Sequence, residues 1–379
     1  MPGLSESTAG RAFAGACRAL RAACLAGALL LAPFAVAPGW AVPAYSNLFV
    51  FGDSLADSGN NAIVFDSLSG VPGALRTPVP IADPYLIPSY PYASGRYSNG
   101  PVWVEQLASS LGLSALPSLA GGSNFAFGGA RVGPAGSSFP YSLLDQVASF
   151  MSATGGSAPG SALYVVEGGG NDARDALLVA AGGGDPTARI VAYALSMANI
   201  VGQLKSGGAQ DILIWNVPDI GKIPAILALG AGVSAQASAL AMAMNVALDS
   251  ALASLPAQWQ TGLIRFDAFA AFNALFADPA AQGFSDVTHA CAADPVCIAS
   301  PGGTFFWDGI HPTTAGHALL AAAVLAELPE PATLLLCALA LAALSLGRRT
   351  RRTRRPQPAK AKPCREQGAL RQARRTADW

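Results

Sequence analysis

Four short apolar runs, separated by longer stretches with helical patterns, limit most strongly what this chain can fold into. The runs cover residues 48–51, 162–167, 211–217 and 263–266. Such runs, apolar on both sides, are typical of parallel strands buried on both faces. Helices are predicted at residues 102–111, 188–205, 235–255 and 314–327. Strands that alternate with helices predict an α/β fold in which helices cover both faces of a parallel sheet.

The first apolar run ends at a candidate nucleophile. Gly52 follows the run, and Asp53 and Ser54 come next, where a helix could begin. A serine at a strand-to-helix turn lies beside backbone N–H groups that have no intrahelical partner, so its hydroxyl faces a site suited to negative charge. The alternative is that Ser54 caps a helix, which is a common role for serine.

Two further segments carry polar residues with catalytic potential. The second run ends at glycines that are followed by Asn171 and Asp172. Near the end of the body, Asp308 and His311 lie three residues apart, and Pro312 favours the start of a helix. Among the three histidines of the chain, His311 alone has an acid this near on one side and a proline on the other. Considered singly, His311 also fits a surface histidine and Asp308 a helix cap.

These residues together can form a site for acyl transfer. Reactive groups gather at the carboxyl ends of parallel strands, so Ser54, Asn171 and His311 are predicted to meet. Imidazole removes a serine proton near neutral pH, and the spacing lets Asp308 orient the imidazole of His311. The oxyanion that forms needs donors, which the backbone at Ser54 and near Gly128 and the amide of Asn171 can supply.

Four motifs occur along the chain in a characteristic order. They are GDSL at 52–55, NFAFGGA at 124–130, GGND at 169–172 and DGIHP at 308–312. In this order they resemble the GDSL (SGNH) hydrolase family, and GRYSNGPVWVEQLA at 95–108 resembles its lipase-like branch. The resemblance spans residues 48 to about 327. It implies a flavodoxin-like three-layer α/β/α sandwich for a hydrolase domain at 45–328.

The resemblance also implies a role for each matching residue. The implied set is Ser54 as nucleophile and oxyanion donor, Gly128 and Asn171 as oxyanion donors, His311 as base and Asp308 as its orienting acid. Motif position decides between Gly128 and the adjacent Gly129. Members of the family are esterases, lipases, thioesterases and carbohydrate acetylesterases, and they need no metal or cofactor.

The expected activity is cleavage of a small-molecule or lipid carboxylic ester through an acyl-enzyme, and the motifs leave the acyl group open. One alternative is an acetylesterase or acyltransferase that acts on extracellular polysaccharide. Another is a non-catalytic surface protein on the same fold.

The amino-terminal segment, residues 1–44, is predicted to be a secretory signal. Arg11, Arg18 and Arg21 give it a positive start, and a compact apolar stretch at 22–37 follows. Small residues after this stretch fit a cleavage site. The alternative is an uncleaved anchor helix.

The carboxyl-terminal segment, residues 329–355, resembles a PEP-CTERM sorting signal. Pro-Glu-Pro at 329–331 is followed by an apolar run at 332–346 and by an arginine cluster. As a helix the apolar run spans ~24 Å, slightly less than a hydrocarbon core of ~30 Å. The resemblance implies processing by an exosortase-type enzyme at the envelope of a Gram-negative bacterium. The protein is then transiently membrane-anchored, and afterwards at the cell surface or extracellular. The alternative is a plain membrane anchor.

The charges are segregated along the chain although the formal net charge is zero. Residues 45–347 hold 8 basic and 20 acidic residues, whereas residues 348–379 hold 12 basic and 2 acidic ones. An acidic body lacks the basic face that nucleic-acid binding requires, so no nucleic-acid partner is expected. The basic tail at 356–379 is predicted to be disordered or to bind anionic lipid.

Two cysteines lie in the body, Cys291 and Cys297. A single close pair in an exported chain predicts a disulfide. The alternative is two free buried thiols. A zinc site is not expected, because His289 is the only nearby ligand of another type.

Residues 61–100 are rich in Pro, Gly, Ser and Tyr and predict a long irregular region. Loops of this length inside a domain are uncommon and are often functional. Its tyrosines either line a substrate cleft or are scattered over the surface; they are Tyr85, Tyr90, Tyr92 and Tyr97.

Overall fold

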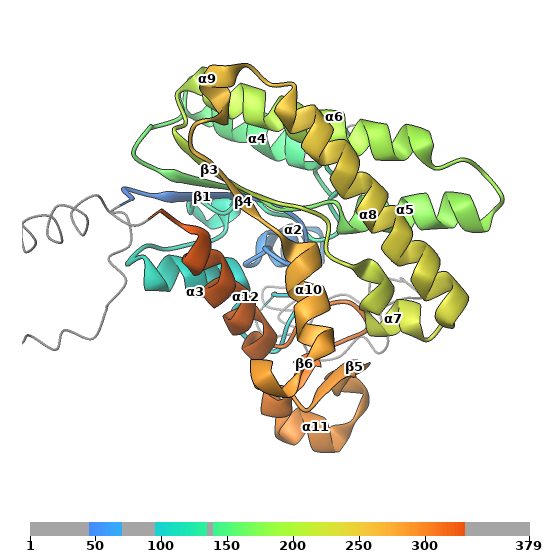
Figure 1. The fold of residues 1–379 in the computed structure, drawn as a ribbon. Helices are drawn as coiled ribbons and strands as arrows, with labels where there is room; N and C mark the ends of the chain where they lie inside the picture. Colours follow the sequence, from blue (N-terminus) through green and yellow to red (C-terminus); the bar gives the residue numbers. More distant parts are fainter. Residues whose placement is uncertain (1–44, 70–94, 135–138, 330–379) are drawn as a thin grey trace, which may run out of the picture. The chain divides into compact units, whose positions relative to one another are not determined.

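A parallel sheet of four strands lies at the centre of the fold, in the order β1-β2-β3-β4 (Figure 1). The strands are β1 (Leu48–Phe51), β2 (Leu163–Val166), β3 (Asp211–Trp215) and β4 (Leu263–Phe266). Val50 is paired with Val165, and Val165 with Leu213. All four strands lie within the predicted runs, which confirms the parallel sheet. The first three strands are almost wholly buried, as apolar side chains on both faces allow. The edge strand β4 is half-buried and carries the exposed Arg265.

A fifth segment, residues 123–127, runs beside β1 in the parallel direction. Val50 N–H donates to Ser123 O at 3.1 Å, and Phe125 N–H donates to Val50 O at 2.7 Å. Phe127 N–H continues the pattern by donating to Gly52 O at 3.1 Å. When this segment is counted as the second strand in sequence, the order becomes 2-1-3-4-5. This is the flavodoxin-like order, whose ligands bind beyond the carboxyl ends of the strands.

Helices cover both faces of the sheet (Figure 1). One face carries α3 (Trp103–Ser110) and α12 (Thr314–Glu327), which pack against each other. The other carries α4 (Leu143–Ala153) and α6 (Thr187–Gly207), and α8 (Ala231–Ala253) packs on α6. The remaining helices are α2 (Asn60–Ser69), α5 (Gly170–Ala181), α7 (Pro224–Leu227), α9 (Ala257–Gln260), α10 (Ala268–Ala277) and α11 (Pro295–Ala299). The predicted three-layer α/β/α sandwich is therefore confirmed.

Aromatic side chains fill the space between the layers. Phe150 of α4 packs on Phe49 and Phe51 of β1, with ring centroids 4.7 and 5.5 Å apart. On the other face, Trp103 of α3 lies 4.4 Å from Trp215 of β3. Burying each such side chain stabilises the fold by ~1.5–3 kcal/mol relative to leaving it in water. The sheet and its helices thus form a firm base for the loops at the strand ends.

The computed structural model describes residues 45–69, 95–134 and 139–329, and all of them belong to one compact unit. The predicted signal at 1–44, the sorting segment from residue 330 onward, the basic tail and Tyr85, Tyr90 and Tyr92 lie outside the described residues. Among the described helices, α8 is long and apolar enough by composition to cross a membrane, with a mean hydropathy of 1.3. It packs on α5, α6 and α7 and is part of the sandwich.

The structure adds elements that the sequence pattern did not predict. The expected irregular region begins with a helix, α2, and the glycine-rich GGND motif leads directly into α5. A small parallel sheet also forms from β5 (Asp286–Ala290) and β6 (Thr304–Phe306). In α5 the glycines concealed the helix start: Gly169 has a φ of +109°, and its carbonyl accepts the first helical bond from Ala173 N–H.

Candidate active site

Ser54 lies on a tight turn directly after β1, and this turn is not the first turn of a helix. The sequence suggested a helix start at Asp53 and Ser54, but α2 begins only at Asn60. Asp53 forms the turn instead: its carboxylate accepts from Leu55 N–H at 3.0 Å, and its carbonyl accepts from Ala56 N–H at 3.2 Å. Asp53, and not Ser54, therefore stabilises this turn, which leaves the hydroxyl of Ser54 for another partner.

That partner is His311, and Asp308 completes a chain of hydrogen bonds. Ser54 Oγ lies 2.7 Å from His311 Nε2, and His311 Nδ1 lies 2.7 Å from Asp308 Oδ2. Ser54 is 9% exposed, His311 3% and Asp308 0%, so the chain is shielded from water. Because an ionised carboxylate only accepts, Nδ1 carries the ring proton and Nε2 is left to accept from the Ser54 hydroxyl.

The loop itself holds Asp308 in place. The second oxygen of Asp308, Oδ1, accepts from Ile310 N–H and His311 N–H at 2.7 Å each. Trp307 N–H donates to His311 O at 2.7 Å and closes the turn. The predicted spacing of three residues thus lets one carboxylate bind both the backbone and the ring of its histidine.

The predicted oxyanion donors Gly128 and Asn171 line the same cavity as Ser54. Gly128 N–H donates to Asp57 Oδ2 at 3.0 Å, and the role of Gly128 as oxyanion donor stays a prediction. The N–H groups of Ser54 and Gly129 have no hydrogen-bond acceptor among the described residues. Motif position could not distinguish the two glycines, because only the fold shows which N–H is occupied.

Asn171, at the start of α5, lies beside the same turn. Its Nδ2 donates to Ala130 O at 2.9 Å and lies 3.4 Å from Asp53 Oδ2. The second contact is long, so one amide proton remains available for a stronger acceptor. Ser54, Asn171, Asp308 and His311 are therefore brought together as the sequence predicted, although they come from three separate regions of the chain.

Asp57 is a functional-site residue that the sequence analysis missed. Its carboxylate is fully buried and accepts from the N–H groups of Gly59, Asn60 and Gly128 at 2.7–3.0 Å. It therefore ties the Ser54 turn to the Gly128 loop. Burial raises the pKa of Asp57 to about 6 against the lowering effect of these donors. The sequence feature that could have pointed to Asp57 is an acidic residue three positions after Ser54, within the same polar segment.

Two further buried carboxyl groups lie next to the nucleophile. Burial raises the pKa of Asp53 to about 6, and the charges of His311 and Arg131 oppose the rise. Glu167 follows β2, and burial and then the charge of Asp53 raise its pKa well above the ordinary value. Two carboxyl groups this close ionise one after the other rather than together. Burial therefore favours the protonated form of both carboxyl groups behind Ser54.

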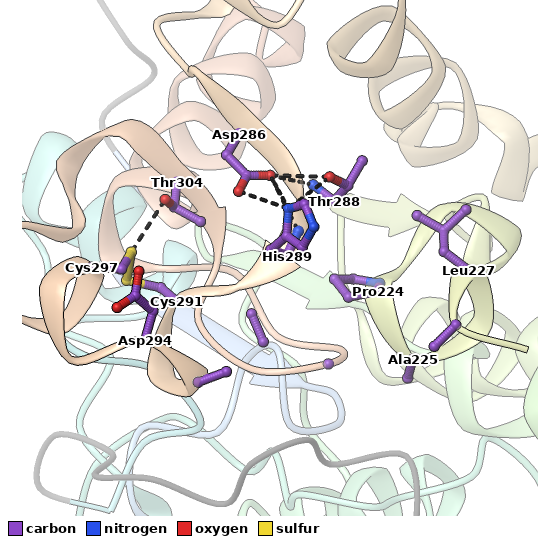
Figure 2. A pocket seen from close by; sticks show the side chains of 14 residues that line it. Pro224, Ala225, Leu227, Asp286, Thr288, His289, Cys291, Asp294, Cys297 and Thr304 are labelled. Carbon is purple, nitrogen blue, oxygen red and sulfur yellow. Dashed lines mark hydrogen bonds and ion pairs between the residues drawn. A yellow bond between two sulfur atoms is a disulfide. The ribbon is translucent and has the colours of Figure 1, made fainter.

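A cavity of about 930 Å³ borders the other side of the Asp308 loop through Gly309, and Figure 2 shows its lining. There Asp286 Oδ2 lies 3.0 Å from His289 Nδ1, and the hydroxyl of Thr288 lies 3.1 Å from the same nitrogen. The Thr288 hydroxyl and the Asp286 carboxylate thus contact the same nitrogen of His289. A hydrogen-bond chain from nucleophile to base to acid would need them on different ring nitrogens. This cavity is larger than the one at Ser54, but its lining residues do not form a serine–histidine–aspartate hydrogen-bond chain.

The predicted disulfide between Cys291 and Cys297 is present on the wall of this larger cavity, with sulfur atoms 2.03 Å apart. The described residues contain no cluster of three or more His, Cys, Asp or Glu side chains that could hold a metal ion.

The comparisons with known proteins agree with this geometry. The family model described as GDSL-like Lipase/Acylhydrolase matches residues 48–324. Phosphatidylcholine-sterol acyltransferase of Aeromonas hydrophila is 27% identical over 336 residues, which cover 73% of this chain and 88% of that protein. Esterase EstA of Pseudomonas aeruginosa is also 27% identical, over 78% of this chain and 49% of its own length. Among solved structures, an acetylxylan esterase of Geobacillus stearothermophilus covers 76% of this chain and 96% of its own, with 15% identity and a TM-score of 0.37.

The family model covers well over half of the chain, and the similar proteins are named as an esterase and an acyltransferase. Both names describe chemistry on ester bonds, which supports an ester-acting enzyme in general. This chain belongs to the GDSL-like lipase/acylhydrolase family.

Proposed function

We propose that this protein is an exported serine hydrolase that cleaves carboxylic esters through an acyl-enzyme intermediate. The observation that carries the proposal is the chain of two 2.7 Å contacts from Ser54 Oγ through the ring of His311 to Asp308. Gly129 and Asn171 line the same cavity as Ser54, and the N–H groups of Ser54 and Gly129 have no acceptor among the described residues. A developing oxyanion requires such donors.

In the first half of the reaction Ser54 Oγ forms a bond to the ester carbonyl carbon, and its proton passes to His311 Nε2. The carbonyl oxygen becomes an oxyanion, which accepts from Ser54 N–H, Gly129 N–H and Asn171 Nδ2. When the intermediate collapses, the bond between the carbonyl carbon and the alcohol oxygen breaks. The alcohol leaves with the proton from His311, and Asp308 stabilises the imidazolium in between.

In the second half, water attacks the acyl-enzyme with His311 again as base, and the acid and free Ser54 are released. An alcohol in place of water would give acyl transfer by the same steps. The name of the Aeromonas relative supports keeping transfer as a second outcome. Hydrolysis and transfer share the acyl-enzyme and differ only in the acceptor.

Export is part of the proposal and rests on the terminal segments. A signal at 1–44 directs secretion, the hydrolase domain is 45–328, and the segment 329–355 anchors the protein until an exosortase-type enzyme processes it. The disulfide supports an oxidising compartment. The proposed role of the basic residues at 356–379 is to contact anionic lipid at the membrane.

The acyl-enzyme predicts burst kinetics. Mixing the protein with excess p-nitrophenyl acetate should release p-nitrophenol in a rapid phase of about one equivalent per enzyme, followed by a slower steady rate. A burst appears when deacylation is slower than acylation. If deacylation is not the slower step, cooling the reaction or adding an alcohol as acyl acceptor separates the two steps. An active preparation with no burst under any of these conditions, and no partition of product between water and alcohol, would contradict the acyl-enzyme. An inactive folded protein would support the non-catalytic alternative.

A further inference from the structure

The disulfide between Cys291 and Cys297 lies beside the catalytic turn, which is formed by residues 307–312. Cys291 directly follows β5, and the catalytic turn directly follows β6. The two strands are paired in the parallel direction, and Ala290 of β5 is aligned with Phe306 of β6. The disulfide and the catalytic turn therefore begin at the same end of two neighbouring strands.

Backbone hydrogen bonds connect the disulfide loop, residues 291–297, to His311 through Trp307. Ala292 N–H donates to Trp307 O at 2.8 Å. Trp307 N–H donates to His311 O at 2.7 Å. Trp307 thus binds the disulfide loop with its carbonyl and the catalytic base with its amide. A shift of the loop would therefore move Trp307 and, with it, the backbone of His311.

Side-chain packing joins the same parts of the molecule. A small cluster, separate from the main core, is formed by the buried side chains of Cys291, Ala292, Trp307 and Tyr97. Cys297 packs against this cluster. The Tyr97 ring also lies against the catalytic base, with its centroid 5.2 Å from that of the His311 ring. The disulfide therefore supports both the residue before Asp308 and the ring beside His311.

Much of the disulfide loop is exposed to solvent. Residues 293–296 are exposed, and Val296 is 77% exposed. The Asp294 carboxylate accepts from Val296 N–H at 2.8 Å, and Asp294 N–H donates to Cys291 O at 3.0 Å. These bonds stay within the loop and do not attach it to the rest of the domain. A segment with little buried apolar surface opens locally at low free-energy cost, so the covalent bond is needed to keep this loop closed.

The disulfide is also within reach of a reductant. Cys297 is half-buried and lines the larger cavity, beside Thr304, whose hydroxyl lies 3.3 Å from Cys297 Sγ (Figure 2). A thiolate of a dithiol can form a bond to one sulfur of the pair, which breaks the bond to the other sulfur, and the second thiol of the dithiol completes the exchange. The protein gains two electrons and two protons as two thiols, and the dithiol becomes a cyclic disulfide.

We infer that the Cys291–Cys297 disulfide positions the catalytic turn, so that ester hydrolysis depends on the oxidised state of this pair. The inference rests on the proposed function, because it concerns the place of His311 relative to Ser54. Neither cysteine lines the cavity at Ser54, and both act through the Trp307 backbone and the packing around it. They are positioning residues, and the rest of the domain keeps its fold without their bond.

The first test compares oxidised and reduced wild-type protein on p-nitrophenyl acetate. The protein is reduced with dithiothreitol and then desalted into deoxygenated buffer, because thiolates themselves attack such esters. Thiol titration checks that the disulfide is open. We expect kcat to fall at least ~10-fold, since a shift of ~1 Å in a catalytic group can lower the rate by ~10²-fold. KM should change less than ~2-fold, because most residues that line the Ser54 cavity lie outside the cluster. Reoxidation with oxidised glutathione should restore kcat.

Two variants show whether the effect belongs to this disulfide. The double variant Cys291→Ala/Cys297→Ala should have the low kcat of the reduced protein. Dithiothreitol should not lower its kcat further, although the cysteines elsewhere in the chain remain. Val296→Ala shortens an exposed side chain of the same loop and keeps the disulfide. It should have the wild-type kcat when oxidised and the same loss when reduced.

A disulfide that only stabilises the fold would give a different result. Reduction would then lower the thermal midpoint but leave kcat unchanged at a temperature where circular dichroism shows a folded protein. A folded reduced protein whose kcat falls less than ~10-fold, the smallest loss expected from a displaced catalytic group, would overturn the inference. Unfolding of the whole domain on reduction would also overturn it, because the loss would not arise at the catalytic turn.

A fluorophosphonate that labels serine nucleophiles separates failure of this inference from failure of the proposed function. If the oxidised protein is labelled at Ser54 and hydrolyses esters, but reduction has no effect, the positioning role is wrong and the hydrolase mechanism stands. If the oxidised protein is neither labelled nor active, the proposed function itself is wrong.

Discussion

Replacing Ser54 with alanine is expected to lower kcat for p-nitrophenyl acetate by ~10⁴- to 10⁶-fold, the range found when a serine nucleophile is removed. The substitution deletes the oxygen that lies 2.7 Å from His311 Nε2 and leaves the backbone donors in place. Residual rate over water would come from binding and from those donors. Steady-state rates with high enzyme concentration measure the loss.

A loss of fold must be separated from a loss of chemistry. Ser54 makes no backbone bond through its side chain, so the thermal midpoint of the Ser54→Ala protein should stay close to the wild-type value. Ser110→Ala, on the exposed end of α3, removes a hydroxyl that bonds only Gln106 O and should leave turnover unchanged. If Ser54→Ala retains more than ~1% of wild-type turnover, an amount too large for the residual catalysis expected, Ser54 is not the nucleophile.

Replacing Asp308 with asparagine is expected to lower kcat by ~10⁴-fold through the histidine tautomer. The amide oxygen can still accept from Ile310 N–H and His311 N–H, so the loop should keep its shape. The amide nitrogen then faces His311 Nδ1, and because it donates, the ring proton must move to Nε2. In that tautomer Nε2 cannot accept the proton of Ser54, so the rate of acylation should fall.

Asp286 provides a matched control for this substitution. It also lies three residues before a histidine and contacts that ring at 3.0 Å, but it lines the larger cavity, away from Ser54. Asp286→Asn should change kcat by less than ~2-fold, the scale of a surface ion pair's small energetic effect. Equal losses in Asp308→Asn and Asp286→Asn would show that neither acid orients a catalytic base.

The sequence was sufficient to predict the sheet and the hydrogen-bond chain from Ser54 through His311 to Asp308, and the physical reasons are related. The first three runs are almost wholly buried and hence are nearly continuous in apolar residues. The fourth is half-buried and includes the exposed Arg265, but it too forms a strand. Ser54 and Asn171 meet because they follow β1 and β2, and the fold brings the carboxyl ends of such strands to one edge. His311 comes to the same edge from the loop before α12. The pairing of Asp308 with His311 follows from their local spacing. None of these predictions needed knowledge of side-chain packing.

The parts that the sequence could not predict depend on contacts between distant segments. The choice between Gly128 and Gly129 turns on one hydrogen bond to Asp57, more than 70 residues earlier. The edge segment at residues 123–127 is flanked by glycines, and its place in the sheet depends on backbone hydrogen bonds to β1, more than 70 residues earlier. The start of α5 was concealed by glycines that have low helix propensity.

The most direct test of the account is to map the residue that a fluorophosphonate modifies in the wild-type protein by peptide mass spectrometry. We expect one adduct per chain, on the peptide that contains Ser54, with loss of esterase activity in proportion to labelling. Stoichiometric labelling at a different residue, or full inactivation with Ser54 unmodified, would contradict it.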